Sequence, residues 1–142
     1  MSEYDIVKRW VQKAEDDLDN AIFMFENKWP RPLELVCYLC AQSAEKALKA
    51  CIIQNGETPP YTHDLGSLCR MCVKHLPEFS DIVDDCLDIA PYAVQTRYPN
   101  NIEIEEAETQ SALRKAERIL DFCRGSALKP PLSQEQTDTD AL

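Results

Sequence analysis

The sequence contains very little glycine, with three residues in 142, at positions 56, 66 and 125. A loop that cradles phosphate groups needs several closely spaced glycines, so a P-loop or a similar glycine-rich site is excluded. The nine prolines are concentrated in a few places. Long regular elements are therefore favoured over many short strands joined by turns.

The sequence also lacks long apolar runs. No stretch of about 18 apolar residues occurs, so we expect no membrane-spanning helix and no membrane contact. The first ten residues, MSEYDIVKRW, are charged and do not contain the apolar segment of a secretory signal peptide. Seven cysteines, an odd number, in a chain without an export signal are typical of reduced thiols, so we expect a cytoplasmic protein. No motif indicates a cofactor.

The sequence contains fewer basic residues than acidic ones. The chain has 15 Lys and Arg against 25 Asp and Glu, which gives a net charge of −10 at pH 7. The segment from Ala127 onwards contributes −2 of this through Lys129, Glu135, Asp138 and Asp140. An acidic domain is a poor non-specific binder of nucleic acid or anionic membrane, although a local basic site can still bind RNA.

Apolar residues recur at steps of three and four along most of the chain, and no strand pattern appears. The predicted helices cover residues 3–27, 32–55, 64–75, 77 to about 90, and 102–124. We expect Gly56 and Gly125 to end the second and the last helix, and Asp64 to begin the third. The predicted fold is all-α.

Because the connections are short, neighbouring helices should be antiparallel. We expect an up-and-down bundle of three long helices plus one or two short ones. It should occupy residues 1–126, and residues 127–142 should form a disordered acidic tail because they carry no periodic apolar pattern.

The second predicted helix is unusually thin. The stretch CYLCAQSAEKALKA contains small side chains on more than one side, namely Cys40, Ala41, Ser43, Ala44, Ala47 and Ala50. Small side chains let helix axes approach closely, towards the short end of the usual range of ~8–10 Å. The sequence therefore predicts a central helix covered by its neighbours, with one face still available for a dimer interface.

Four motifs occur in order along the chain. They are A-x-x-D-L-x-x-A at residues 14–21, Q-x-x-x-K-A-L-K-A at 42–50, Thr-His-Asp-Leu at 62–65 and Arg-Tyr-Pro at 97–99. Together they resemble the signature of HEPN domains, which are small bacterial and archaeal helical bundles. The resemblance covers residues 4–128.

The resemblance implies a function. Such chains are often encoded beside a small nucleotidyltransferase, with which they form toxin–antitoxin-like pairs, and many are homodimers. We therefore expect a dimerising helical binding module with a nucleotidyltransferase-type partner. We expect nucleotide or RNA binding at Arg97, Tyr98, Asn100 and Asn101.

Ribonucleases of this family carry an Arg-x(4–6)-His motif at the position of Arg97. The arginine would hold the scissile phosphate and the histidine would move a proton. Here no histidine follows Arg97, so the proton carrier is missing. The alternative function is a metal-independent endoribonuclease toxin in which Arg97 acts with a displaced histidine, His63. Otherwise Arg97 pairs with an acidic side chain or caps a carbonyl.

His63 and Asp64 allow two interpretations. Asp64 can cap the following helix while His63 hydrogen-bonds across the loop, or His63 can share a cleft with Arg97. The cysteines also form two C-x-x-C pairs, Cys37 with Cys40 and Cys69 with Cys72. Both pairs lie inside helical patterns, where such spacing only makes two residues neighbours. We therefore interpret them as buried apolar residues and expect no metal site.

Overall fold

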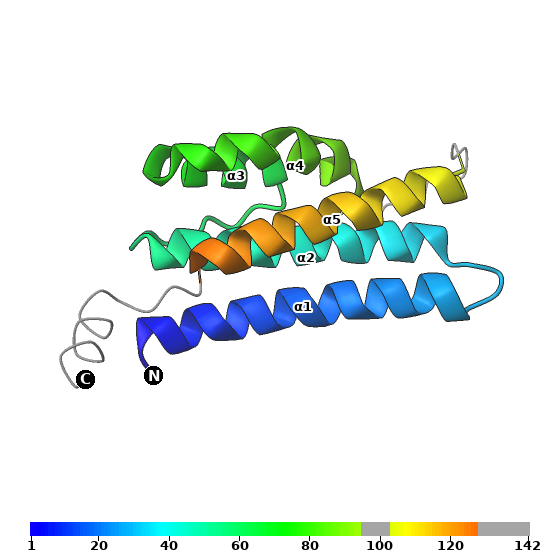
Figure 1. Ribbon diagram of the computed structural model, residues 1–142, viewed down its shortest axis with the longest axis horizontal. Helices are drawn as coiled ribbons and strands as arrows, with labels where there is room; N and C mark the ends of the chain where they lie inside the picture. The colour runs from blue at the N-terminus through cyan, green and yellow to red at the C-terminus, as the bar shows by residue number, and fades with distance from the viewer. Residues whose placement is uncertain (95–102, 128–142) are drawn as a thin grey trace.

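The computed structural model describes residues 1–94 and 103–127 (Figure 1). The described residues contain helices and no strand, which confirms the predicted all-α class. The α-helices are α1 (Glu3–Asn27), α2 (Leu33–Gln54), α3 (Leu65–His75), α4 (Val83–Ile89) and α5 (Glu106–Ala127). Two 3-10 segments, η1 (Pro77–Ile82) and η2 (Ala90–Ala93), flank α4.

Side-chain caps define where two of the helices begin. Ser2 and Asp5 form a reciprocal pair at the start of α1: the Asp5 amide donates to Ser2 Oγ over 3.1 Å, and the Ser2 amide donates to Asp5 Oδ2 over 3.2 Å. Asp64 caps α3 as expected, because its Oδ1 accepts from the Gly66 amide over 3.1 Å. Each cap satisfies amides that have no partner within the helix.

Two predicted helix boundaries were wrong. The single helix expected from residue 77 to about 90 is interrupted, because residues 77–82 form the 3-10 segment η1 and only Val83–Ile89 are α-helical. The last helix was expected over 102–124, ended by Gly125, but α5 starts at Glu106 and continues through Gly125. Ala127 is fully buried, so packing of the last turn outweighs the poor helix propensity of glycine.

The three long helices have different relative directions. In Figure 1, α1 runs opposite to α2 and to α5, whereas α2 and α5 run in the same direction. Two contacts fix this parallel register: the Cys37 thiol donates to Thr109 Oγ1 over 3.5 Å and the Cys51 thiol donates to the Cys123 carbonyl over 3.6 Å. Both contacts join residues 72 positions apart. Parallel alignment is possible because the short helices return the chain to the end where α2 began.

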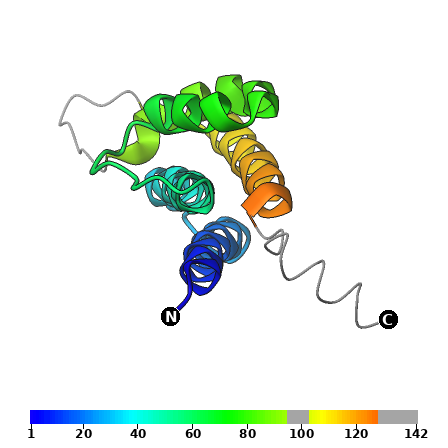
Figure 2. The ribbon, with the colours of Figure 1, turned by 90° about the vertical axis from the view of Figure 1, so that its left-hand side faces the viewer.

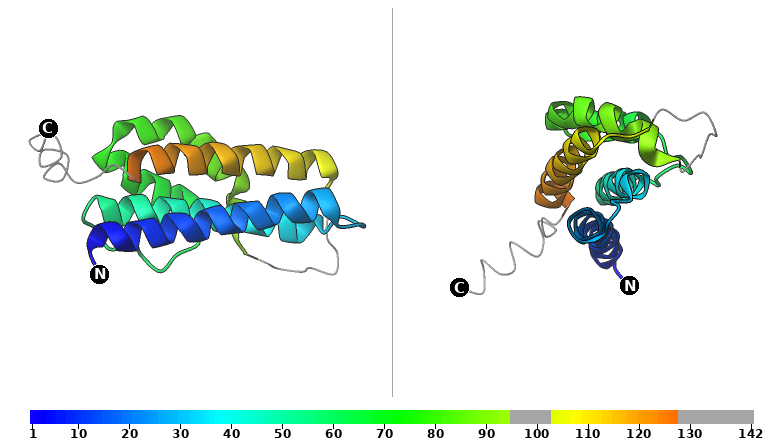
Figure 3. Two further views of the ribbon diagram at one scale, coloured as in Figure 1. Left: turned by 60° about the horizontal axis from the view of Figure 1, so that its bottom comes forward. Right: turned by 90° about the vertical axis from the view of Figure 1, so that its right-hand side faces the viewer.

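Helix α2 is the centre of the bundle, as predicted. It contacts each of the other four α-helices. Viewed end-on, it lies between α1 and the layer of α3 and α4, with α5 beside it (Figures 2 and 3). The small side chains expected to allow this are fully buried, namely Cys40, Ala41, Ser43, Ala44, Ala47 and Ala50.

The contact between α1 and α2 shows how closely the helices approach. Ser43 Oγ on α2 donates a hydrogen bond of 2.8 Å to the backbone carbonyl of Ala14 on α1. A side chain as short as serine reaches a neighbouring backbone only where two helices pack closely. Ala14 is itself fully buried, so this contact lies in the core.

Candidate functional site

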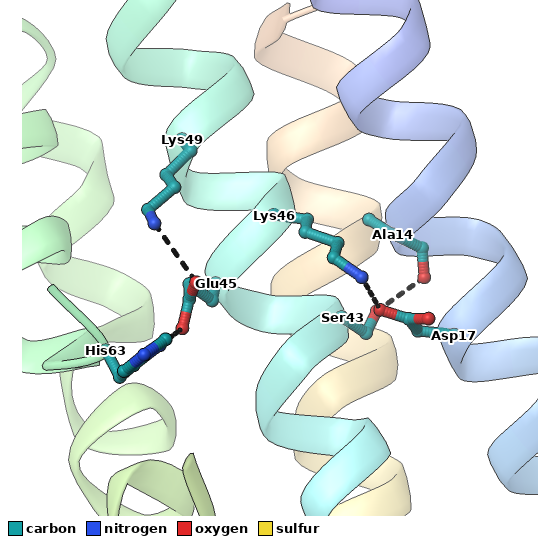
Figure 4. A network of polar contacts seen from close by, with 7 residues as sticks. All are labelled: Ala14, Asp17, Ser43, Glu45, Lys46, Lys49 and His63. Atoms are coloured by element: carbon teal, nitrogen blue, oxygen red, sulfur yellow. Dashed lines mark hydrogen bonds and ion pairs between the residues drawn. The ribbon is translucent and has the colours of Figure 1, made fainter. Parts of the chain in front are cut away.

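A polar stripe interrupts the small and apolar surface of α2. It consists of Gln42, Glu45, Lys46 and Lys49, whose spacing of three and four residues places them on one side of the helix. Two branches leave this stripe (Figure 4). On the α1 side, Lys46 Nζ lies 2.5 Å from Asp17 Oδ2, and this pair links α1 to α2.

The second branch centres on Glu45, whose side chain is only 7% exposed. Its Oε2 accepts from Lys49 Nζ over 3.0 Å, and its Oε1 lies 2.8 Å from Nδ1 of His63 (Figure 4). A carboxylate removed from water needs such partners, because desolvation of an unpaired charge is costly. The two contacts therefore give the Glu45 carboxylate partners on α2 and on the loop that precedes α3.

The histidine of this cluster is held at one nitrogen. An ionised carboxylate only accepts hydrogen bonds, so Nδ1–H of His63 donates to Glu45. The ring tautomer is thereby fixed, and Nε2 carries the lone pair when the imidazole is neutral. The His63 side chain is 64% exposed, so this nitrogen can meet a molecule from solvent. A histidine oriented by a carboxylate can take up and return a proton.

Asp64 does not join this cluster. Its carboxylate accepts from the Gly66 amide and, over 2.6 Å, from the Ser67 hydroxyl, while its own amide donates to Thr62 Oγ1 over 3.1 Å. These hydrogen bonds, that of Ser67 foremost, hold the pKa of Asp64 below its usual value. The structure therefore shows the cap at Asp64 and the hydrogen bond of His63 across the loop, whereas a cleft shared by His63 and Arg97 stays a prediction.

The structure brings His63 together with Glu45 and Lys49. The other candidate residues, Arg97, Tyr98, Asn100 and Asn101, lie outside the described residues. Their relation to His63 therefore stays a prediction. Sequence reasoning missed Glu45 as a site residue, although a signal was present: Glu45 and Lys49 form an i, i+4 pair of opposite charge on a helix that is otherwise small and apolar.

The two C-x-x-C pairs lie inside α2 and α3, as the periodicity predicted, and all seven cysteines are buried. Burial raises the pKa of Cys37 to about 11, and it raises the pKa of Cys72 still further. Within residues 1–94 and 103–127, no three His, Cys, Asp or Glu residues are grouped as metal ligands. Thiols in such surroundings behave as small apolar side chains.

The described helices are each too short or too polar to cross a bilayer. The geometry defines a class of protein, a small all-α bundle built around one thin helix with a buried ionic cluster. The family model of the HEPN domain matches residues 7–126. The chain therefore belongs to the HEPN domain family.

Solved structures agree with this fold. The chain is similar to TT1696 from Thermus thermophilus, with a TM-score of 0.68 and 24% identity over 84% of this chain and 97% of the other. It is also similar to ST0689, an archaeal HEPN homologue, with a TM-score of 0.64 and 23% identity over 85% of this chain and 97% of the other. At these identities the likeness establishes the fold alone. No protein with a curated description matches the chain.

Proposed function

We propose that this HEPN protein is a dimerising binding module of the cytosol. It would pair with a nucleotidyltransferase-type partner in a toxin–antitoxin-like system and bind nucleotide or RNA. Membership of the family supports this proposal. The binding residues proposed are Arg97, Tyr98, Asn100 and Asn101, since an arginine followed by an aromatic and two amide side chains suits a phosphate and a base.

The observation that best supports a dimer is the outward face of α2. Leu35, Leu39 and Ile53 are only partly buried there, and they lie on the same side of the helix as the polar stripe. An interface that covers this face would remove three apolar side chains from water. It would also bring two copies of the polar stripe close together.

The experiment measures assembly and binding separately. Light scattering coupled to gel filtration gives the mass of the full-length protein, and Leu39→Glu is expected to convert a dimer into a monomer. The matched control is Leu87→Glu, an exposed leucine on α4. Anisotropy of a labelled single-stranded RNA and of a labelled adenine nucleotide then tests binding, which Arg97→Ala should weaken about tenfold. A monomeric wild type, or binding unaffected by Arg97→Ala, would contradict the proposal.

One observation favours the second function, a metal-independent endoribonuclease. His63 is oriented by the buried Glu45 and has most of its ring in solvent. Such a group could accept the proton of a 2′-hydroxyl while Arg97 holds the phosphate. The test is incubation with RNA in the presence of a chelator. Cleavage that is lost in both Arg97→Ala and His63→Ala would establish this function, and cleavage that survives in both would indicate a contaminating nuclease.

A further inference from the structure

A cavity of about 520 Å³ lies along the first half of α1, where α1 meets α2. Its size falls within the range of sites for small molecules, roughly 300–1,000 Å³. The residues that line it include none of the cluster around Glu45 and none of the four residues proposed to bind RNA. The residues that line it are Met1, Ile6, Arg9, Trp10, Lys13 and Lys46.

The charge of this cavity is opposite to that of the protein. The chain carries a net −10, yet residues 6–13 contain three basic side chains and no carboxylate. Arg9 and Lys13 are four residues apart on α1, where two like charges destabilise a helix by a few tenths of a kcal/mol. None of the six residues that line the cavity is acidic, so together they create a local positive potential on an acidic domain.

The three cations that line the cavity differ in their contacts. Lys46 is neutralised by Asp17 at 2.5 Å. Lys13 has no ion-pair partner among the described residues, and the contact of Arg9 is with the Met1 thioether, with Nη1 and Sδ 3.6 Å apart. Two cations are thus left to bind an anion, and the planar guanidinium of Arg9 suits two oxygens of one phosphate.

The cavity also has an apolar side. Trp10 is partly buried, and Ile6 remains 37% exposed beside it. A flat ring can stack on the indole of Trp10 while its charged group reaches Arg9 and Lys13. We propose that this cavity binds a small organic phosphate that carries a planar ring. The two cations contact the phosphate, and Trp10 with Ile6 contacts the ring.

The chain contains two tryptophans, so Trp29→Phe leaves Trp10 as the single fluorescent indole in the full-length protein. Phenyl phosphate is the probe, compared with inorganic phosphate and with benzyl alcohol. We expect saturable quenching by phenyl phosphate, with at least about tenfold weaker binding of either comparison compound, since each lacks one of the two contacts.

Variants then assign the contacts. Arg9→Gln and Lys13→Gln should each weaken binding of phenyl phosphate about tenfold, because each removes a charge-assisted contact. The matched control is Arg114→Gln, an exposed arginine on α5 without an ion-pair partner among the described residues. Circular dichroism then checks that each variant is folded. Arg97→Ala should leave this binding unchanged, which separates a failure here from a failure of the proposed function.

Three results would overturn the inference. The first is the absence of saturable quenching by phenyl phosphate. The second is equal weakening by Arg114→Gln, which would indicate only the general ionic atmosphere. The third concerns the acidic residues Glu135, Asp138 and Asp140. Suppose that replacing these three residues by their amides changes the fluorescence of Trp10 in the absence of ligand, and that phenyl phosphate does not bind to either form. The cavity is then occupied by that segment of the chain rather than by a small molecule.

Discussion

Substitution of Lys49 by methionine tests whether the cluster around Glu45 is an ionic unit. Methionine retains most of the length and apolar area of lysine but removes the ammonium group 3.0 Å from Glu45. Glu45 would keep its hydrogen bond to His63, whose side chain lies largely in solvent. Because the carboxylate is 7% exposed, it would be left as a buried charge without its nearest cation. Breaking such a pair on one side costs about 3 kcal/mol.

The companion variant, Glu45→Gln, keeps the shape and the hydrogen-bonding capacity of the side chain but removes its charge. We expect it to cost about 1 kcal/mol, because the Lys49 ammonium can still turn towards water. The double variant Glu45→Gln/Lys49→Met removes both charges. Its cost should therefore be about 2 kcal/mol smaller than the sum of the single variants, since no buried charge remains uncompensated.

The assay is chemical denaturation at neutral pH, with thermal unfolding as a second measurement. Lys49→Met should lower Tm by roughly 10 °C, and the double variant should recover about a third of that loss. Lys74→Met, an exposed lysine on α3, serves as the control and should change little. The reasoning would be refuted if Lys49→Met cost less than about 1 kcal/mol, or if the two substitutions were additive.

Three further predictions concern the core, the cap and the thiols. Ala44→Leu should destabilise by about 3 kcal/mol because the site is fully buried between helices, whereas Ala107→Leu on the exposed start of α5 should be nearly neutral in denaturation. Asp64→Ala should cost about 1 kcal/mol at pH 7. Because the folded-state pKa of Asp64 is lowered, its contribution is lost as pH falls below about 4, so the difference from wild type should shrink in denaturation at pH 3. All seven thiols should resist a thiol reagent at pH 8 in the native protein and react in denaturant, because they are all buried; rapid reaction of even one native thiol would contradict this.

Most of the helices could be predicted from the periodicity of apolar residues in the sequence. The first helix begins and ends where it was expected, at residues 3 and 27, because an amphipathic pattern and a clear stop coincide there. The small residues of α2 correctly indicated its central position. Periodicity failed over residues 77–90, where one helix was expected: residues 77–82 form a 3-10 segment and only Val83–Ile89 are α-helical. It also failed at Gly125, because only tertiary packing makes α5 continue.

Two features could not be predicted from the sequence and needed the three-dimensional structure. They are the relative direction of α2 and α5 and the cluster around Glu45. Short connections predict antiparallel neighbours, yet the direction of α5 depends on how far the chain travels through α3 and α4. His63 and Glu45 are 18 residues apart, and nothing in the spacing shows that the loop after α2 folds back along it. The cap at Asp64 was predictable because capping is local, with partners two and three residues away.

The parallel register of α2 and α5 has a consequence for the order in which the chain acquires its structure. The hairpin of α1 and α2 joins neighbouring segments, so its loop is short and its closure entropy small. Docking of α5 instead closes loops of about 70 residues, as the partners of Cys37 and Cys51 show. We expect α5 to dock late during refolding. In pulse-labelling hydrogen exchange, amides of α1 and α2 should then become protected before those of α5, and the reverse order would contradict this.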